Sequence, residues 1–204
     1  MNSQKLRRLT MAALCGAVAF VLMYFGFSIP FISPFAEFEL SSLPELIGGF
    51  ILGPVGAVEI IVVKIGLKLL FKGTSSMFTG EVQSLLLSMA YVLPAVWYYR
   101  RHKDKKGAVK SLVLGSAVSV FVAIFTNLYL IFPAFMYLYG MDWGQIVASC
   151  SAVNPWIKDV PTMVVFSVVP FNIISRAITS VLTMLIYKRI SVPLKRLIRD
   201  HESK

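Results

Sequence analysis

The stretch Val169-Pro170-Phe171-Asn172-Ile173-Ile174-Ser175-Arg176 lies in the last long apolar run of the chain. Arg176 is the only charged residue between positions 160 and 187, and this run is long enough to cross a bilayer. A charge near the centre of a bilayer costs about 3 kcal/mol on insertion scales, so a partner or a ligand is expected. Asn172 lies four residues earlier, on the same helical face. The stretch therefore predicts a membrane helix that carries one polar patch.

The composition of the whole chain is that of an integral membrane protein. Hydrophobic residues make up 57% of the 204 positions, and the mean hydropathy is +0.75, which is too apolar for an ordinary soluble domain. This length suits a single membrane domain, residues 1–204, of about six helices with short connections. The first apolar run is long enough to span and has no small-residue cleavage site before a polar start, so we expect it to be retained.

The formal charge of +10 indicates a membrane topology rather than binding to nucleic acid. Of the 20 Lys and Arg residues, 15 lie in three clusters, at positions 5–8, 100–110 and 188–204, and each cluster flanks an apolar run. Basic clusters beside membrane spans mark the cytoplasmic side. If all three clusters are cytoplasmic, the chain crosses the membrane an even number of times, with both termini inside.

The apolar runs and their interruptions predict an all-α bundle of six transmembrane helices. Two prolines and alternating Phe and Glu residues between positions 28 and 40 predict a partly extended outer loop, which is either a lid or an interfacial loop. Gly53-Pro54 is expected to separate two helices, and Pro133 to end or kink another. The expected helices are residues 9–27, 43–53, 55–71, 82–99, 111–132 and 160–187, followed by a basic cytoplasmic tail at 188–204.

The sequence offers no constellation for catalysis. His102 and His201 both lie in charge clusters, and Cys15 and Cys150 form neither a close pair nor a metal-ligand spacing. The small-residue loop at positions 72–80 lacks the spacing of a phosphate-binding loop. We therefore expect no enzyme, no metal site, no cofactor and no use of ATP by this chain alone.

Polar side chains at middle or outer depth form the candidate binding site. In an apolar bundle covered by aromatic outer loops, such groups are typical of a pocket for an amphipathic solute, although a buried Asn also serves as glue between helices. Lys64 lies about 140° around its helix from Glu59, so its partner must come from elsewhere. Lys68 and Lys72 are expected to reach the outer interface. The candidates are Lys64, Glu81, Gln83, Asn127, Asn172 and Arg176.

Small residues make one flank of the first helix nearly smooth. Ala13 and Ala17 are spaced four apart, and Ala12 and Gly16 repeat that spacing one position earlier. In lipid such patterns mark close helix contacts, either within the fold or with another protein. The spacing alone leaves both readings open.

The sequence resembles the S components of energy-coupling factor (ECF) vitamin importers, most closely the riboflavin-type branch. The resemblance is carried by Ala13 and Ala17, by residues 43–49 running into Gly53-Pro54-Val55-Gly56, by Val63-Lys64, by the Asn127 region, and by residues 169–174. It implies a bacterial plasma-membrane protein of six helices with cytoplasmic termini. It also implies an outer loop that closes the site, with Phe35, Phe38 and Leu40 as lid residues.

The same resemblance implies partners and a substrate. Ala13 and Ala17 would dock on a membrane coupling subunit of the EcfT type, which works with two ATPases to import a water-soluble vitamin. Asn127 and Asn172 match the riboflavin-type pattern, whereas Ile65, Ser84 and Ser175 stand where that pattern has Asn, Asn and Lys. Ser84 and Ser175 are therefore added to the expected substrate contacts.

Riboflavin is the expected substrate, with three further readings left open. Lys64 and Arg176 would instead hold a carboxylate, which suits pantothenate. A structural or assembly protein would use the same polar residues only as interhelical glue. A stand-alone secondary transporter would show inverted repeats, which the sequence does not display.

Overall fold

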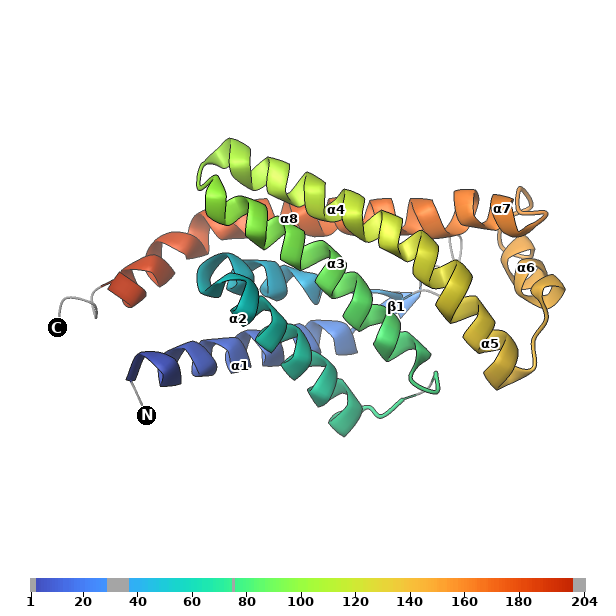
Figure 1. Cartoon of the computed structure of the whole chain (residues 1–204), viewed down its shortest axis with the longest axis horizontal. Helices are drawn as coiled ribbons and strands as arrows, with labels where there is room; N and C mark the ends of the chain where they lie inside the picture. The colour runs from blue at the N-terminus through green and yellow to red at the C-terminus, as the bar shows by residue number, and fades with distance from the viewer. Residues whose placement is uncertain (1–2, 29–36, 75, 200–204) are drawn as a thin grey trace.

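The computed structural model describes residues 3–28, 37–74 and 76–199, and this part of the chain is almost entirely helical (Figure 1). Within it, five helical stretches are long and apolar enough to cross a membrane. The all-helical membrane fold is thus confirmed at this level. The stretches are Gln4–Tyr24, Ser42–Phe71, Thr79–Arg101, Lys105–Tyr139 and Val160–Ile186.

Helix α1 (Ser3–Tyr24) runs beside α2 (Ser42–Phe71), and small residues allow the close approach (Figure 1). A Cβ added at Gly16 would lie 2.6 Å from Cγ1 of Val63, and Ala12 is buried. Ala13, by contrast, is exposed and Ala17 half-buried. One small-residue stripe therefore packs inside the fold, and the neighbouring stripe remains on the surface.

Helix α2 consists of two arms that meet at Gly53. The backbone of Gly53 has φ 85° and ψ −175°, which is not helical, and Pro54 follows it. Such a φ favours glycine because a Cβ would be strained there. The interruption falls where the sequence predicts it, and the chain turns back at this point (Figure 1). The turn brings residues on the two arms to the same depth.

Helix α3 (Thr79–Arg101) leads through a short turn into α4 (Lys105–Thr126), where the Asp104 side chain caps the helix by accepting from the backbone N–H of Gly107 at 2.7 Å. The helix then continues through a π-helical turn, η1 (Asn127–Ile131), into α5 (Phe132–Tyr139). The predicted end at 132 is therefore wrong. The π turn shifts the hydrogen-bond register just before Pro133, so the missing N–H of the proline is accommodated without a break.

The last span repeats this arrangement. After α6 (Trp143–Ser151) the chain enters α7 (Val160–Met163), a second π turn, η2 (Val164–Val168), and α8 (Val169–Arg199). Pro170 follows η2 as Pro133 follows η1. The helix continues to Arg199 and so includes most of the segment predicted as a tail beyond 187. The two π turns lie beside the residues that the sequence selects as polar contacts.

The connection after α1 contains a short antiparallel pair, β1 (Phe27–Ser28) and β2 (Glu37–Phe38). Phe27 is the register partner of Phe38, and their rings lie 5.5 Å apart. Helix α1 therefore ends at Tyr24 rather than at residue 27, because Phe27 is in this strand. The predicted lid residue Phe35 lies outside the described residues.

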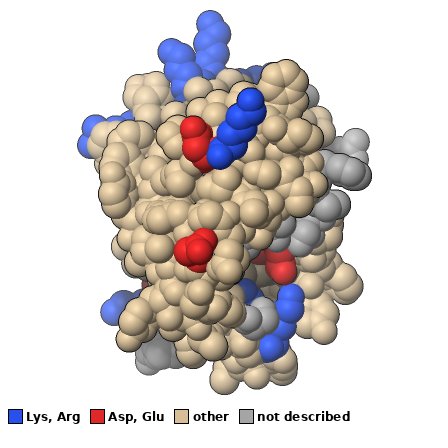
Figure 2. Space-filling model, turned by 90° about the vertical axis from the view of Figure 1, so that its right-hand side faces the viewer, with Lys and Arg blue, Asp and Glu red and all other residues tan. Residues whose placement is uncertain are grey.

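Charge is distributed unevenly between the two ends of the bundle. Figure 2 shows the end that carries α6 and α7, where Lys, Arg, Asp and Glu are sparse among uncharged side chains. Arg100, Arg101 and the start of α4 lie at the opposite end, near both termini (Figure 1). The basic turn between α3 and α4 and the sparsely charged surface of α6 and α7 thus lie at opposite ends of the bundle.

We expect Gly53→Ala to destabilise the protein, because the alanine would have to adopt the positive φ of this turn, which is strained for any residue with a Cβ. A strained residue of this kind costs about 1–3 kcal/mol. The measurement is the thermal unfolding midpoint in detergent. Gly66→Ala is the matched control, since a Cβ at Gly66 meets nothing within 4 Å. Equal midpoints for the two variants would contradict the role of the turn.

Candidate functional site

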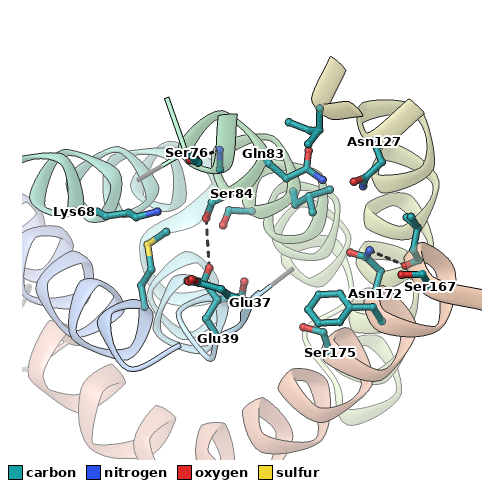
Figure 3. A pocket seen from close by; sticks show the side chains of 18 of the residues that line it. Glu37, Glu39, Lys68, Ser76, Gln83, Ser84, Asn127, Ser167, Asn172 and Ser175 are labelled. Carbon is teal, nitrogen blue, oxygen red and sulfur yellow. Dashed lines mark hydrogen bonds between the residues drawn. The ribbon is translucent and has the colours of Figure 1, made fainter. Parts of the chain in front are cut away.

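A cavity of about 340 Å³ lies at the end of the bundle that carries β2 and α6. Its size is within the range of small-molecule sites, and polar side chains alternate in its wall with Leu87, Phe132, Phe135 and Phe171. The polar lining includes side chains from β2, α2, α3, η1, η2 and α8 (Figure 3). The cavity therefore offers an apolar body with a few placed polar groups, the usual form of a ligand site.

Six of the eight predicted substrate contacts line this cavity. They reach it from three different helical segments, and Figure 3 shows most of them around one space. The other two, Lys64 and Glu81, do not line it. The six are Gln83, Ser84, Asn127, Asn172, Ser175 and Arg176.

The two asparagines next to the π turns are oriented alike. Nδ2 of Asn127 donates to the backbone carbonyl of Ala123 at 2.7 Å, and Nδ2 of Asn172 donates to that of Val168 at 2.9 Å (Figure 3). A carbonyl oxygen accepts only from the amide nitrogen, so these contacts fix which way each carboxamide points. The Oδ1 atoms are left for a ligand. Both asparagines therefore offer an acceptor oxygen to the cavity, and each nitrogen keeps one further N–H.

Arg176 both lines the cavity and packs against neighbouring helices. Its Nη1 donates to the hydroxyl of Ser42 at 3.1 Å, and its guanidinium lies over the ring of Tyr91 at 4.8 Å. The Tyr91 hydroxyl in turn hydrogen-bonds to Ser180 at 2.7 Å. Among the described residues no carboxylate lies within ion-pair distance of Arg176. It is thus a buried cation held by a ring and a hydroxyl.

Lys64 has the partner that the sequence requires but does not identify. Its Nζ lies 2.6 Å from Oε1 of Glu45, and both side chains are fully buried. Glu45 is on the first arm of α2 and Lys64 on the second, so the turn at Gly53 brings them together. Glu59, which the sequence rejects as a partner, lies 3.8 Å from Arg8 instead. The charge of Lys64 is therefore compensated within the protein.

Lys68 and Glu81 form a second pair at the edge of the cavity, with Nζ and Oε1 2.9 Å apart. Oε2 of Glu81 also accepts hydrogen bonds from Thr74 and Ser76. Lys68 lines the cavity and its side chain is largely buried. The expectation that Lys68 simply reaches the outer interface is therefore wrong, because a buried carboxylate holds it inside.

Several lining residues were missed by the sequence analysis. Glu37 and Glu39 both line the cavity, whereas Phe38 between them is buried against Phe27. Alternate residues of a strand lie on the same face. The alternation of Phe and Glu in the sequence therefore already indicated that Glu37 and Glu39 lie on one face and Phe38 on the other. Of the predicted lid residues, Phe38 and the half-buried Leu40 do not line the cavity.

Cys150 also lines the cavity, from α6. Burial raises the pKa of its thiol to about 11, so the group is neutral at pH 7. A neutral, buried thiol behaves as a small apolar group with little reactivity. Cys150 therefore contributes to the apolar part of the wall.

Comparison with known proteins identifies related chains over nearly the full length. The model of the family described as "ECF transporter, substrate-specific component" matches residues 7–187. The riboflavin transporter RibU of Staphylococcus aureus is 28% identical over 197 residues, covering 97% of each chain. The riboflavin transporter FmnP of Bacillus subtilis is 25% identical over 186 residues, covering 90% of this chain and 91% of the relative.

A solved structure is also similar to this chain. It is described as the S component of a bacterial ECF transporter, and it superposes with a TM-score of 0.73 at 28% identity. The match covers 94% of this chain and 99% of the other. The arrangement of helices is therefore shared along nearly the whole chain.

We expect Lys64→Met to lower stability strongly, because it leaves the Glu45 carboxylate buried without its ion partner. Breaking such a pair costs about 3–5 kcal/mol, whereas replacing both partners by apolar residues is often neutral. The double variant Lys64→Met with Glu45→Leu should therefore recover most of the loss. Thermal unfolding in detergent measures both. A single variant as stable as the double would show that the pair carries no such constraint.

Proposed function

The chain belongs to the family of ECF transporter substrate-specific components, and from this premise we propose that it captures riboflavin outside the cell. It is a transport protein with helices that span the plasma membrane of a bacterium. Its relatives RibU and FmnP are riboflavin transporters, which supports the choice of substrate. Uptake would be driven by an EcfT-type coupling subunit and two ATPases.

The observation that carries the substrate proposal is the polarity of the cavity. Asn127 and Asn172 present acceptor oxygens, and Glu37 and Glu39 add carboxylates to the lining. Such a wall suits a neutral ligand that has hydroxyl and N–H donors, as the polyol chain and ring imide of riboflavin do. Arg176 supplies a donor for the carbonyl oxygens of the ring.

Pantothenate fits this cavity less well. Of the two cations expected to hold a carboxylate, Lys64 is compensated by Glu45 and lies outside the cavity. Among the charges in the lining, Glu37 and Glu39 offset Arg176 and Lys72, and Lys68 is already paired with Glu81. A purely structural role for the polar residues leaves the cavity unexplained.

The proposed topology places both termini in the cytoplasm. The turn at Gly53 lies beside Arg100, at the basic end of the bundle, which is the cytoplasmic side by the positive-inside rule. Counting the two arms of α2 separately gives six helices. The first arm, from Ser42 to Gly53, is too short to cross a bilayer on its own and lies among the other helices.

Docking on the coupling subunit is assigned to the outward stripe of α1. Ala13 is exposed and Ala17 half-buried, whereas the stripe of Ala12 and Gly16 is occupied by contacts within the fold. A smooth helix flank allows close approach of a second helix in lipid. This division supports Ala13 and Ala17 as a contact between proteins.

We expect the purified protein to bind riboflavin, measured as quenching of flavin fluorescence, and Asn172→Leu to weaken this binding about tenfold. The replacement removes an acceptor and leaves a ligand donor unpaired. Ile173→Val is the control, because Ile173 is exposed on the far side of α8. Displacement of riboflavin by pantothenate, or equal affinity of Asn172→Leu and the wild type, would refute the substrate proposal.

We expect Ala13→Trp to abolish riboflavin uptake by cells that contain the coupling subunit and ATPases, while riboflavin binding by the purified variant stays normal. A large ring on the smooth flank blocks close helix packing. Leu14→Trp is the control, since Leu14 is exposed and already large. Normal uptake with Ala13→Trp would show that the coupling subunit docks elsewhere.

A further inference from the structure

Lys64 does not line the cavity but contacts side chains that do. Its Nζ donates to the hydroxyls of Ser41, Ser88 and Ser84 at 3.1, 2.9 and 3.5 Å. Ser84 and Ser88 line the cavity, whereas Lys64 does not. A fully buried ammonium thus holds cavity-lining groups without reaching the ligand space itself.

The direction of the hydrogen bonds follows from the chemistry of the ammonium. Lys64 donates only, so each serine oxygen accepts from it and has a single O–H left to donate. Ser41 and Ser84 donate to Oε1 of Glu39, at 2.9 and 3.3 Å. Ser88 donates to Oε1 of Glu45 at 3.2 Å. Lys64 therefore orients the Ser41 hydroxyl toward Glu39, and its longer contact with Ser84 favours the same direction there.

Glu39 links the hydrogen bonds of Lys64, Ser41 and Ser84 to strand β2. It directly follows the strand, lines the cavity, and its Oε1 lies 4.0 Å from Nζ of Lys64 (Figure 3). Ser84, which binds it, is on α3, 45 positions later in the chain. Glu37 lines the same cavity, but in the described part of the chain its carboxylate makes no ion pair. Glu39 thus attaches the strand to the helical wall.

We infer that Lys64 is a positioning residue for the ligand site, acting through Glu39 to hold residues 37–39 against α3. This inference rests on the proposed function, because it assigns Lys64 and Glu39 a part in retaining the bound vitamin. Loss of the Glu39 charge weakens two charge-assisted hydrogen bonds and the ion pair with Lys64. The strand then separates from α3 more often, and a ligand in the cavity leaves faster.

The first test needs no ligand. Amide hydrogen exchange at residues 37–41 is measured in the ligand-free protein for the wild type, Glu39→Gln and Glu37→Gln. Exchange should be about tenfold faster in Glu39→Gln, because the strand has lost its attachment to α3. It should be unchanged in Glu37→Gln, which carries the same chemical change two residues earlier in the same segment. Equal exchange in the two variants would overturn the inference.

The second test measures the rate of riboflavin dissociation. Glu39→Gln should raise it about tenfold, which corresponds to about 1.4 kcal/mol. Lys64→Met with Glu45→Leu, which removes both members of the fully buried pair, should raise it by a similar factor. Glu59→Gln is the control: its ion pair with Arg8 lies outside the cavity, so dissociation should remain at the wild-type rate.

The combined effect of the substitutions at Lys64 and Glu39 on the dissociation rate distinguishes a positioning role of Lys64 from a general structural role. If Lys64 acts through Glu39, adding Glu39→Gln to the Lys64→Met, Glu45→Leu background should raise the rate less than twofold. A full tenfold increase in that background would overturn the inference. Failure of the wild type to bind riboflavin would instead refute the proposed function, and the exchange experiment would still decide on the attachment of the strand.

Discussion

The ion pair between Lys64 and Glu45 is the interaction on which the rest of the bundle depends. Neither charge has access to water, and a membrane interior provides no alternative partner for either. The pair therefore requires the two arms of α2 to lie side by side, which in turn requires the turn at Gly53. Hydroxyls from α3 and from the start of α2 complete the ammonium's contacts, so three segments are placed at once.

The cavity depends on a second constraint, the satisfaction of backbone groups inside a membrane. A π turn changes the hydrogen-bond register of a helix. Next to the two π turns, the carbonyls of Ala123 and Val168 accept from the side chains of Asn127 and Asn172. Each asparagine thus bonds to the backbone of its own helix with its nitrogen and leaves its oxygen for the cavity. Local helix geometry and ligand polarity are set by the same side chains.

Much of the fold and several residues of the site could be predicted from the sequence, and the predictions that failed did so for physical reasons. Apolar length and basic flanks predict membrane helices, and Gly53-Pro54 predicts the turn. Asn127, Asn172 and Arg176 stand out because polar groups are rare in apolar runs. The partner of Lys64 could not be identified, since it depends on how the two arms cross. Pro133 was misread because periodicity does not reveal a π turn. Glu39 was missed because its importance comes from contacts 25 and 45 residues away.

The two stripes of α1 have a consequence for how this protein can change over generations. Ala12 and Gly16 face α2, and any larger side chain there meets the fold itself. Ala13, one position after Ala12, is exposed, and Ala17 is only half-buried, so changes there disturb the fold less. The inward stripe is therefore constrained by the protein's own architecture, and the outward one more by whatever it contacts. Two alanines that are adjacent in sequence thus answer to different selection pressures.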